Sequence, residues 1–428
     1  MVVVVQAPTA LPTGLLSSAL SIMTFNVLLP NSLDGWWLYK QYPAGCNNLA
    51  SISAWPARQA LIRSQIASSN CDVVMVQEAS PESFESDFGF MAELGYVNKL
   101  YEKKGRFRPA TFWRSERWRL IESASRDRCL VTTFEGAGGV VSVINAHLQA
   151  GPEGGRRLRQ TQEALDYASK SLKRLGHPLA SVVFGGDLNG GDDSAAVQLL
   201  EKSVVEAGFV EDGAACTSRK RTNPLGPFTD VARSAHSPKA PPPTLVLPEL
   251  FGLLSRGDNP GTRSDDLSTK AVEALTEAFT ERGGATWGKA EIDQWLLDIN
   301  GALGRGSEYR SAYARTTTTD EREAGERPPI AEDAQLSLDD FIGIYTDELR
   351  QGKVWGVAHD LNVLGKWPLS PSTALFTARY DRLYASANTR VLALRDTTSE
   401  VACPNERHPS DHLPVTALIE INLQDLLL

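Results

Sequence analysis

Acidic, amide and imidazole side chains recur at the carboxyl ends of short apolar segments, or in the loops beyond them, in this 428-residue sequence. A buried apolar strand has no structural use for such groups unless they meet, because an unpaired buried polar group costs roughly 1–3 kcal/mol. If they meet, four acids, two amides and two imidazoles share one site: Asn26, Glu78, His147, Asp187, Asn189, Asp381, Asp411 and His412. Carboxylate and amide oxygens suit a hard divalent cation, and the imidazoles remain to bind a phosphate.

The elements that must position these residues follow an α/β pattern. Short apolar runs predict strands over 21–29, 72–77, 140–146, 181–184 and 413–421, with a strand pair at 110–113 and 118–121. Helices are predicted over 55–69, 81–94, 153–175 and 193–207. Strands that alternate with helices of this length indicate an α/β fold.

The middle of the chain has a different composition. A proline-rich stretch at 238–248 and a charged, threonine-rich stretch at 311–329 accompany helical patterns at 267–282, 290–303 and 338–350. We therefore predict a mainly helical insertion over 234–371. It splits the α/β domain into 20–233 and 372–428 and leaves 1–19 as an N-terminal extension.

Within the insertion, the loop at 280–291 has Glu291 at its twelfth position, as in an EF-hand loop. Residues 336–345 resemble an EF-hand more weakly. The first, third and fifth positions are Thr280, Arg282 and Gly284, and one glutamate without partner carboxylates cannot hold Ca²⁺ well. We therefore expect a degenerate EF-hand-like pair of helices with a structural role. The segment 352–361 is expected to cover the active site or to bind a partner.

The charge and the cysteines exclude several classes of protein. With 43 Lys and Arg against 52 Asp and Glu, the net charge of −9 argues against non-specific coating of duplex nucleic acid, which needs a broad basic surface. No apolar run approaches ~20 residues, so no transmembrane helix is expected. The five scattered cysteines indicate neither a disulfide framework nor a cysteine zinc site. The N-terminus lacks the basic start of a secretory signal, so a cytoplasmic location is expected.

Six segments that contain the candidate residues follow one another in a distinctive order: TFNVL (24–28), DVVMVQE (72–78), INAHL (144–148), GGDLN (185–189), ARYDRLY (378–384) and PSDHLP (409–414). In order and spacing they resemble the endonuclease/exonuclease/phosphatase superfamily, which has the deoxyribonuclease-I-like fold. The resemblance covers 20–233 and 372–428. It implies a two-layer β-sandwich flanked by helices and a metal-dependent phosphoric ester hydrolase.

The resemblance also implies a metal site. Glu78 would be the principal ligand of Mg²⁺, or of Mn²⁺ in its place. Asn26 and Asp411 would be its partners, either directly or through water.

The catalytic roles implied by the resemblance fall to five further residues. Asp187 would orient or deprotonate the attacking water, and Asn189 would hold the phosphate. His147 and His412 would donate to the non-bridging oxygens of the crowded transition state. Asp381 would accept a hydrogen bond from His412 and fix its tautomer.

Two basic segments lie outside these motifs. Lys103, Arg106 and Arg108 stand among aromatic residues in 99–113 and are candidates for binding a second phosphate or a nucleobase; the alternative is a solvated hairpin. The basic run 156–159 opens a predicted helix. It most simply faces solvent, although positive charge there opposes the helix dipole, a conflict that an anion would relieve.

The fold alone does not name the substrate. The acidic composition and the local basic segment favour a phosphodiesterase or nuclease that acts on a small or single-stranded phosphate: a nucleotide, a single-stranded nucleic acid or a phospholipid headgroup. The alternatives are a phosphomonoesterase for inositol phosphates or nucleotides, and a sphingomyelinase-like phospholipase. From a different class, the alternative is a catalytically silent scaffold whose insertion docks a protein partner.

Overall fold

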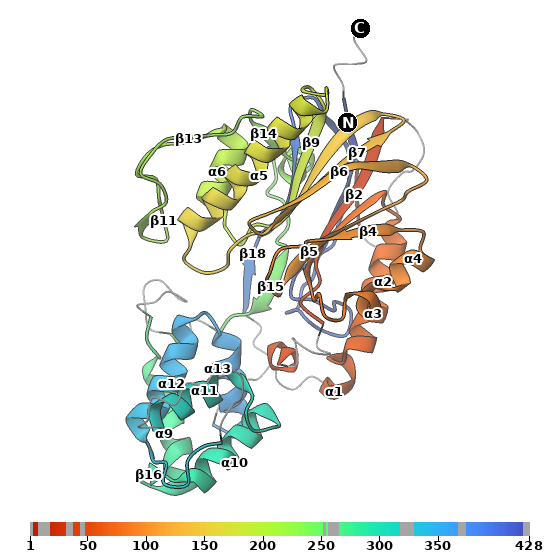
Figure 1. The fold of residues 1–428 in the computed structure, drawn as a ribbon. Helices are drawn as coiled ribbons and strands as arrows, with labels where there is room; N and C mark the ends of the chain where they lie inside the picture. The colour runs from red at the N-terminus through yellow and green to blue at the C-terminus, as the bar shows by residue number, and fades with distance from the viewer. Residues whose placement is uncertain are drawn as a thin grey trace. The chain divides into compact units, whose positions relative to one another are not determined.

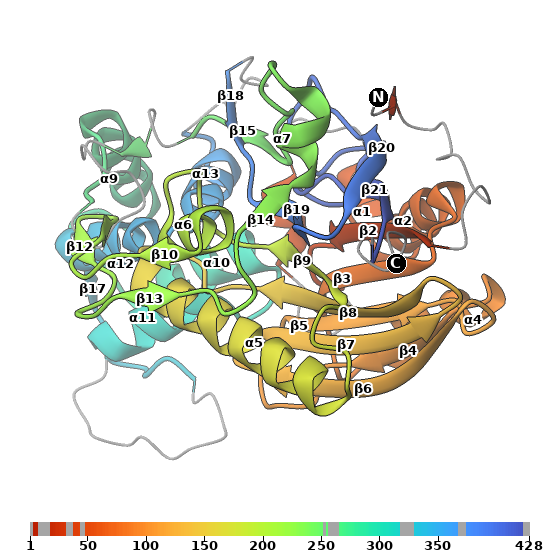
Figure 2. The same ribbon diagram turned by 90° about the horizontal axis from the view of Figure 1, so that it is seen from above.

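The computed structural model describes residues 3–6, 18–30, 37–42, 48–250, 254–255, 265–316, 329–366 and 374–422. The chain divides into two compact units. Unit 1 contains Met1–Trp36, Ala50–Leu247 and Thr377–Leu428, and unit 2 contains Trp37–Leu49 and Pro248–Phe376. The two sheets of unit 1 and the helices of unit 2 can be followed in Figure 1 and Figure 2.

Unit 1 is built on two mixed sheets. Sheet 1 has seven strands in the order β1 (Val3–Gln6), β20 (Arg390–Asp396), β21 (Val415–Glu420), β2 (Ala19–Asn26), β3 (Val73–Ala79), β5 (Arg108–Trp113) and β4 (Val97–Leu100). Sheet 2 has six strands in the order β14 (Phe228–Asp230), β19 (Asp381–Ser386), β9 (Ser181–Asp187), β8 (Gly139–His147), β7 (Cys129–Gly136) and β6 (Trp118–Arg126). Two-residue strands pair in two short ribbons, β10 (Val204–Val205) with β13 (Arg221–Thr222) and β11 (Val210–Glu211) with β12 (Ala214–Ala215).

Apolar side chains fill the space between the two sheets and bury the outer face of each. Ile22 of β2 and Val143 of β8 belong to the core between the sheets. Helices α2 (Trp55–Ser69), α3 (Phe84–Phe88) and α4 (Phe90–Glu93) pack on sheet 1, whereas α5 (Gly154–Arg174) and α6 (Ala195–Lys202) pack on sheet 2. Because both faces of each sheet are buried, the central strands are apolar throughout, which explains the uninterrupted apolar runs in the sequence. The predicted two-layer sandwich flanked by helices is confirmed.

The predicted pairing of residues 110–113 with residues 118–121 is wrong. Strand β5 pairs with β3 and β4 in sheet 1, and β6 pairs with β7 in sheet 2. The turn between β5 and β6 takes the chain from sheet 1 to sheet 2. Trp113 and Trp118, on either side of this turn, both lie in the core between the sheets. Burial of two tryptophans in a shared core outweighs the local preference for a hairpin.

Unit 2 is mainly helical. It contains η1 (Leu38–Gln41), α9 (Thr269–Gly283), α10 (Lys289–Asn300), α11 (Gly306–Thr316), α12 (Leu338–Arg350) and α13 (Val354–Val363). Strands β16 (Thr286–Trp287) and β17 (Leu336–Ser337) pair in antiparallel fashion, with Trp287 opposite Leu336. Trp287 is fully buried and stacks on Phe279 with 4.4 Å between ring centroids.

The acidic residues of the EF-hand-like segments cap helices in this structure. The Oε2 atom of Glu291 accepts a hydrogen bond from the Gly288 backbone N at 3.0 Å at the start of α10. Asp340 Oδ2 likewise accepts from the Ser337 backbone N at 3.4 Å at the start of α12, and it also accepts from the Ser337 hydroxyl at 2.6 Å. Both carboxylates thus have a structural use that needs no cation. The EF-hand-like character of the insertion stays a prediction.

The short segment 37–42 is held to unit 2 by a buried lysine. Lys40 Nζ lies 2.8 Å from Asn300 Oδ1, 3.0 Å from Asp360 Oδ1 and 3.4 Å from Glu308 Oε1. Burial lowers the pKa of Lys40, but Asp360 and Glu308 outweigh burial and raise it above its ordinary value. The lysine therefore stays charged and joins helices α10, α11 and α13 to η1.

The predicted domain limits stay a prediction, because a division into compact units does not show that each unit folds by itself. Strand β15 (Leu245–Pro248) pairs with β18 (Leu375–Ala378) where the chain leaves unit 1 and returns to it. Of the predicted extension 1–19, only residues 3–6, 18 and 19 are among the described residues. No helix in the described part of the chain is both long and apolar enough to cross a membrane.

Candidate functional site

Three of the candidate residues lie in register on neighbouring strands of sheet 2. His147 ends β8 and is opposite Asp187, which ends the parallel strand β9. Asp187 is in turn opposite Asp381, which begins the antiparallel strand β19. The three side chains therefore share one edge of sheet 2.

Sheet 1 contributes Asn26 and Glu78. Asn26 ends β2, and Glu78 lies one residue beyond its parallel partner Gln77 on β3. Glu78 has a φ of +66°, at an irregularity where the pairing of β3 with β5 shifts between Val76 and Ala79. The left-handed backbone conformation points this side chain away from the face that regular strand alternation would give it. Such bulges and positive φ values of residues other than glycine are common at functional sites.

Asp411 and His412 precede β21 rather than follow a strand, and Asp381 begins its strand. The sequence placed all three at the carboxyl ends of strands or in the loops beyond. They reach the same edge because β19 and β21 are antiparallel to β9 and β2. Ser410 joins the segment before β21 to the end of β2. Its hydroxyl donates to the Asn26 carbonyl oxygen at 2.7 Å and accepts from His412 N at 3.1 Å.

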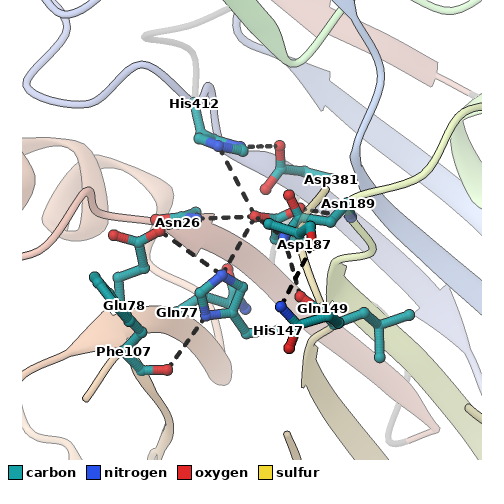
Figure 3. A network of polar contacts seen from close by, with 12 residues as sticks. Asn26, Gln77, Glu78, Phe107, His147, Gln149, Asp187, Asn189, Asp381 and His412 are labelled. Carbon is teal, nitrogen blue, oxygen red and sulfur yellow. Dashed lines mark hydrogen bonds and ion pairs between the residues drawn. The ribbon is translucent and has the colours of Figure 1, made fainter. Parts of the chain in front are cut away.

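The amide and carboxylate groups form one hydrogen-bonded network, in which the side chains point toward one another (Figure 3). Asn26 Nδ2 donates to Asp187 Oδ2 at 3.0 Å and to Glu78 Oε1 at 3.2 Å. Asn189, with a φ of +48°, donates its Nδ2 to Asp187 Oδ2 at 3.2 Å and its backbone N to Asp187 Oδ1 at 2.9 Å. The second oxygen of Glu78 accepts from Leu29 N at 3.1 Å.

His147 is oriented by a backbone carbonyl. Its Nδ1 lies 3.2 Å from the Phe107 carbonyl oxygen, which can only accept, so Nδ1 carries a proton. Its Nε2 is then directed at the acids and lies 3.7 Å from both Glu78 Oε1 and Asp187 Oδ2.

His412 and Asp381 form a buried pair. Nδ1 of His412 lies 2.7 Å from Asp381 Oδ2, and Nε2 lies 3.9 Å from Asp187 Oδ2. Burial would lower the pKa of His412, but Asp381, Asp411 and Asp187 together raise it well above its ordinary value. These carboxylates therefore favour the protonated imidazole, whose Nε2 is directed into the site.

The acids of the site repel one another. The pKa of Asp411 is raised to about 6, mainly by burial and further by Glu78, Asp187 and Asp381, while His412 opposes the shift. Asp187, Asp381 and His412 can each offer one ligand atom within 4.8 Å of the others. A site of buried carboxylates that repel one another suits a divalent cation, because the charge of +2 on the ion would relieve the repulsion.

The predicted basic residues lie beside the site rather than in the network. Arg108 Nε donates to the Gly105 carbonyl oxygen at 2.8 Å, and its Nη1 donates to that of Tyr101 at 3.2 Å, so this arginine closes its own loop. Lys103 and Arg106 are exposed. The loop meets the site through Phe107, whose ring meets that of His147 edge-on with 6.4 Å between centroids.

Sequence reasoning missed the buried residues that hold this edge together. Gln77 of sheet 1 donates to Asn145 Oδ1 of sheet 2 at 2.8 Å, and Asn145 Nδ2 donates to the Ala110 carbonyl oxygen at 2.9 Å. Arg58 of α2 is fully buried and donates to backbone carbonyls of the loops after β2 and before Asp411. A polar residue inside an apolar strand was a signal for Gln77 and Asn145, but nothing in the sequence marked Arg58.

Comparison with known proteins gives a family and a fold. The model of the Endonuclease/Exonuclease/phosphatase family matches residues 23–412. Two crystal structures of ANGEL2, a 2′,3′-cyclic phosphatase, one of them in complex with adenosine-2′,3′-vanadate, match with TM-scores of 0.56 and 0.55 and identities of 13% and 14%. The matches cover 95% and 94% of this chain and 96% and 95% of the ANGEL2 chains.

The human Nocturnin catalytic domain with bound sulfate anion matches with a TM-score of 0.45 and 12% identity, over 95% of this chain and 96% of that chain. No curated protein sequence matches the chain. At identities of 13% and 14%, the two ANGEL2 structures show a shared fold alone.

Proposed function

The chain belongs to the endonuclease/exonuclease/phosphatase family of phosphoester hydrolases, and we propose that it is a Mg²⁺-dependent phosphodiesterase or nuclease for a small or single-stranded phosphate substrate. The observation that carries the proposal is the network in which Asp187 receives hydrogen bonds from Asn26 and Asn189 while His412 is held by Asp381. Next to this network, the Ser410 hydroxyl donates to the Asn26 carbonyl oxygen across 384 positions of sequence and so holds the segment before His412 against the end of β2.

Glu78, Asp411 and Asn26 would hold the cation. Two carboxylates and an amide oxygen are the donor set that Mg²⁺ prefers, and Mn²⁺ accepts the same set. Bound there, the ion would neutralise the charge that develops on the phosphate and the leaving oxygen.

The remaining side chains would handle the water and the phosphate. Asp187 would orient the attacking water and accept its proton, and Asn189 would donate to a phosphate oxygen. His412, charged and held at Nδ1 by Asp381, would donate from Nε2 to a non-bridging oxygen. His147, held at Nδ1 by the Phe107 carbonyl oxygen, would donate from Nε2 on the other side when it is protonated.

The test uses substrates that separate the esterase classes. With Mg²⁺, the chain is expected to cleave bis-p-nitrophenyl phosphate and oligo(A), and Asp187→Ala should lower kcat by roughly 10²–10⁴-fold. Asp193→Ala, a change at an exposed acid close by in the sequence, is the matched control and should leave kcat unchanged.

The panel also contains a nucleoside 2′,3′-cyclic phosphate, p-nitrophenyl phosphate, phosphoinositides and sphingomyelin. Cleavage of monoesters alone would make the chain a phosphatase, and turnover of sphingomyelin alone would make it a phospholipase. Turnover of none would favour a silent scaffold. Full turnover by a His412→Ala variant would show that the roles given above are wrong. A cytoplasmic location and a protein partner for the insertion stay predictions from the sequence.

A further inference from the structure

The hydroxyl of Thr244 fixes the start of β19, the strand that begins with Asp381. Thr244 is buried, and its Oγ1 accepts from the backbone N of Asp381 at 3.0 Å and from that of Tyr380 at 3.1 Å. A hydroxyl oxygen has two lone pairs, and here both accept from backbone N–H groups. The backbone from which the Asp381 side chain leaves is therefore anchored directly to Thr244.

The backbone of Thr244 holds the segment that carries His412. Its carbonyl oxygen accepts from the N of Leu413, the residue after His412, at 2.7 Å. On the other side, its own N donates to the Ala378 carbonyl oxygen at 2.9 Å, and the next residue, Leu245, forms an antiparallel bridge with His412. One residue thus lies between the two segments whose side chains form the buried histidine–aspartate pair, and it is bonded to both.

Three consecutive prolines, at positions 241–243, lead into Thr244. Proline has no backbone N–H and a fixed φ, so this stretch has few conformations and Thr244 N is the first donor after it. Pro242 and Pro243 line a small pocket together with Thr244 and Asp381. The proline-rich stretch therefore does more than lead into the helical insertion, because it limits the positions that Thr244 can take beside Asp381.

The hydroxyl also has a hydrogen of its own to donate. Burial raises the pKa of Asp381, whereas His412 and a hydrogen bond from the Thr244 hydroxyl act in the opposite direction. The hydroxyl thus favours the carboxylate form of Asp381, which is the form that accepts from His412 Nδ1 across 2.7 Å. Thr244 supports both the place of this carboxylate and its ability to accept.

We propose that Thr244 is a positioning residue for the hydrolysis: it fixes Asp381 relative to the segment of His412 and so aims His412 Nε2 at the phosphate. The proposal rests on the proposed function, in which His412 donates to a non-bridging oxygen. Thr244 would act through the pair and not by contact with the substrate. A displacement of about 1 Å in a catalytic group can cost roughly 10²-fold in rate, so a residue that sets this geometry has a measurable effect.

The first measurement needs no turnover. An imidazole Nδ1–H that is held on a buried carboxylate gives a proton NMR signal at low field, and the signal of His412 is assigned by its absence from His412→Ala. Thr244→Val keeps the shape of the side chain but removes the hydroxyl, and the signal is expected to disappear or to broaden beyond detection. Thr244→Ser keeps the hydroxyl and should keep the signal.

The second measurement is the rate with bis-p-nitrophenyl phosphate and Mg²⁺. Thr244→Val should lower kcat by roughly 10- to 100-fold and leave KM within about two-fold, because the pair acts on the transition state. Thr244→Ser should stay within about three-fold of the parent in kcat. In the His412→Ala background, Thr244→Val should change kcat by less than about two-fold, because there is no imidazole left to position.

Ser386→Ala is the matched control at the other end of β19. The Ser386 hydroxyl accepts from Val182 N at 2.9 Å, so this variant also removes a bond between a hydroxyl and a backbone N–H next to the same strand. It should keep both the low-field signal and kcat.

The proposal is overturned if Thr244→Val keeps the signal and kcat, if Thr244→Ser loses them, or if the parent gives no signal. An equal fall of kcat with and without His412 would make Thr244 a merely structural residue. So would a Thr244→Val chain that does not fold when Thr244→Ser does. A parent that gives the signal but cleaves no phosphodiester would refute the proposed function and leave the NMR comparison to decide whether Thr244 holds the pair.

Discussion

At the scale of single residues, Arg58 fastens the loops that flank the candidate metal site. Its guanidinium donates to the carbonyl oxygens of Leu29 at 3.1 Å, Val27 at 2.6 Å and Pro409 at 2.8 Å, and also to that of Leu28. The first loop carries Leu29 N, which bonds Glu78, and the second leads into Asp411. One side chain thus fixes the backbone on both sides of the proposed metal ligands.

Removal of the Arg58 guanidinium should therefore weaken folding and catalysis together. Arg58→Met keeps most of the aliphatic volume but leaves buried carbonyl oxygens without donors, and we expect a loss of about 3 kcal/mol or more in the free energy of unfolding. Denaturant unfolding measures that loss, and kcat at saturating Mg²⁺ reports the displaced loops.

Arg63→Met is the control on the same helix, because Arg63 pairs with Glu93 on the surface. Its effect should stay within about 0.5 kcal/mol. A stable Arg58→Met protein with normal kcat would mean that the loops hold their shape without this arginine.

The candidate residues themselves could be inferred from the sequence because their types are unexpected where they occur. Asp187 after an apolar strand, or Asn26 within one, has to be satisfied by something distant. Arg58 could not be inferred in this way, because an arginine in an amphipathic helix is ordinary. Only the fold reveals that its donors all reach inward.

At the scale of elements, Gly186 sets the distance between β8 and β9. Its φ is +129°, and a Cβ there would stand 1.9 Å from the Ala146 carbonyl oxygen. The neighbouring Gly185 is also closely surrounded, by Leu383, Met75 and the Arg382 carbonyl oxygen. The two glycines before Asp187 thus allow three strands to approach closely just below the site.

Gly186→Ala is expected to separate β8 from β9 and move Asp187 away from His147. The backbone collision adds to the strain of a positive φ, so the loss in stability should be about 3 kcal/mol or more, with loss of activity. Gly105→Ala provides a matched comparison, because Gly105 has a φ of +133° and no atom within 4 Å of the added Cβ.

Thermal unfolding of the two variants then separates the collision from the strain. Gly105→Ala should lose only the smaller, conformational part, about 1 kcal/mol. Equal losses in both variants would show that the approach of the two strands plays no part.

Most elements could be predicted because their periodicity is local. Helix α2 was predicted with the same ends that it has, and α5 within one residue at each. The 193–207 helix was predicted too long, since α6 ends at Lys202 and Ser203 adopts a left-handed conformation. The predicted pairing of 110–113 with 118–121 was wrong because packing in the core decides which strands pair, and a short window of sequence does not show that packing.

At the scale of the whole molecule, unit 2 buries several charged side chains, among them Lys40, Glu308, Glu348 and Asp360. Glu348 of α12 is 2% exposed, and its Oε1 lies 3.2 Å from Lys353 Nζ. Burial raises the pKa of Glu348, and Glu308 raises it further, while Lys353 and Ser307 act in the opposite direction. The folded state therefore favours the protonated carboxyl more than the unfolded state does.

This shift has a defined sign for stability. Because the folded pKa lies above the ordinary value of 4.5, the contribution of Glu348 is fully favourable below pH 4.5 and is lost as the pH rises through the folded pKa. Glu348→Gln should therefore raise the midpoint of thermal unfolding at pH 7, and the gain should be smaller at pH 4.

Asp347→Asn is the matched control on the same helix, where the side chain is 43% exposed and pairs with Arg315. Calorimetry at both pH values should find little change in that variant. A gain for Glu348→Gln that is equal at pH 4 and pH 7 would contradict the linkage.

The arrangement of the whole molecule was the least accessible from sequence. The segment 37–42 follows β2 closely in the chain, yet it belongs to unit 2 through Lys40, whose partners lie 260 to 320 residues away. Composition identified the middle of the chain as different, but nothing in the composition of residues 37–42 could assign them to the same unit.

The order of strands in sheet 1 also has a consequence for how the protein is made. Strand β2 lies between β3 and β21, so one of its two neighbours is translated almost four hundred residues after it. Asp411 and His412 arrive immediately before that late strand. The nascent sandwich would therefore have an open edge at β2 until β21 has been synthesised, and hydrolytic activity should appear only after that strand has emerged from the ribosome.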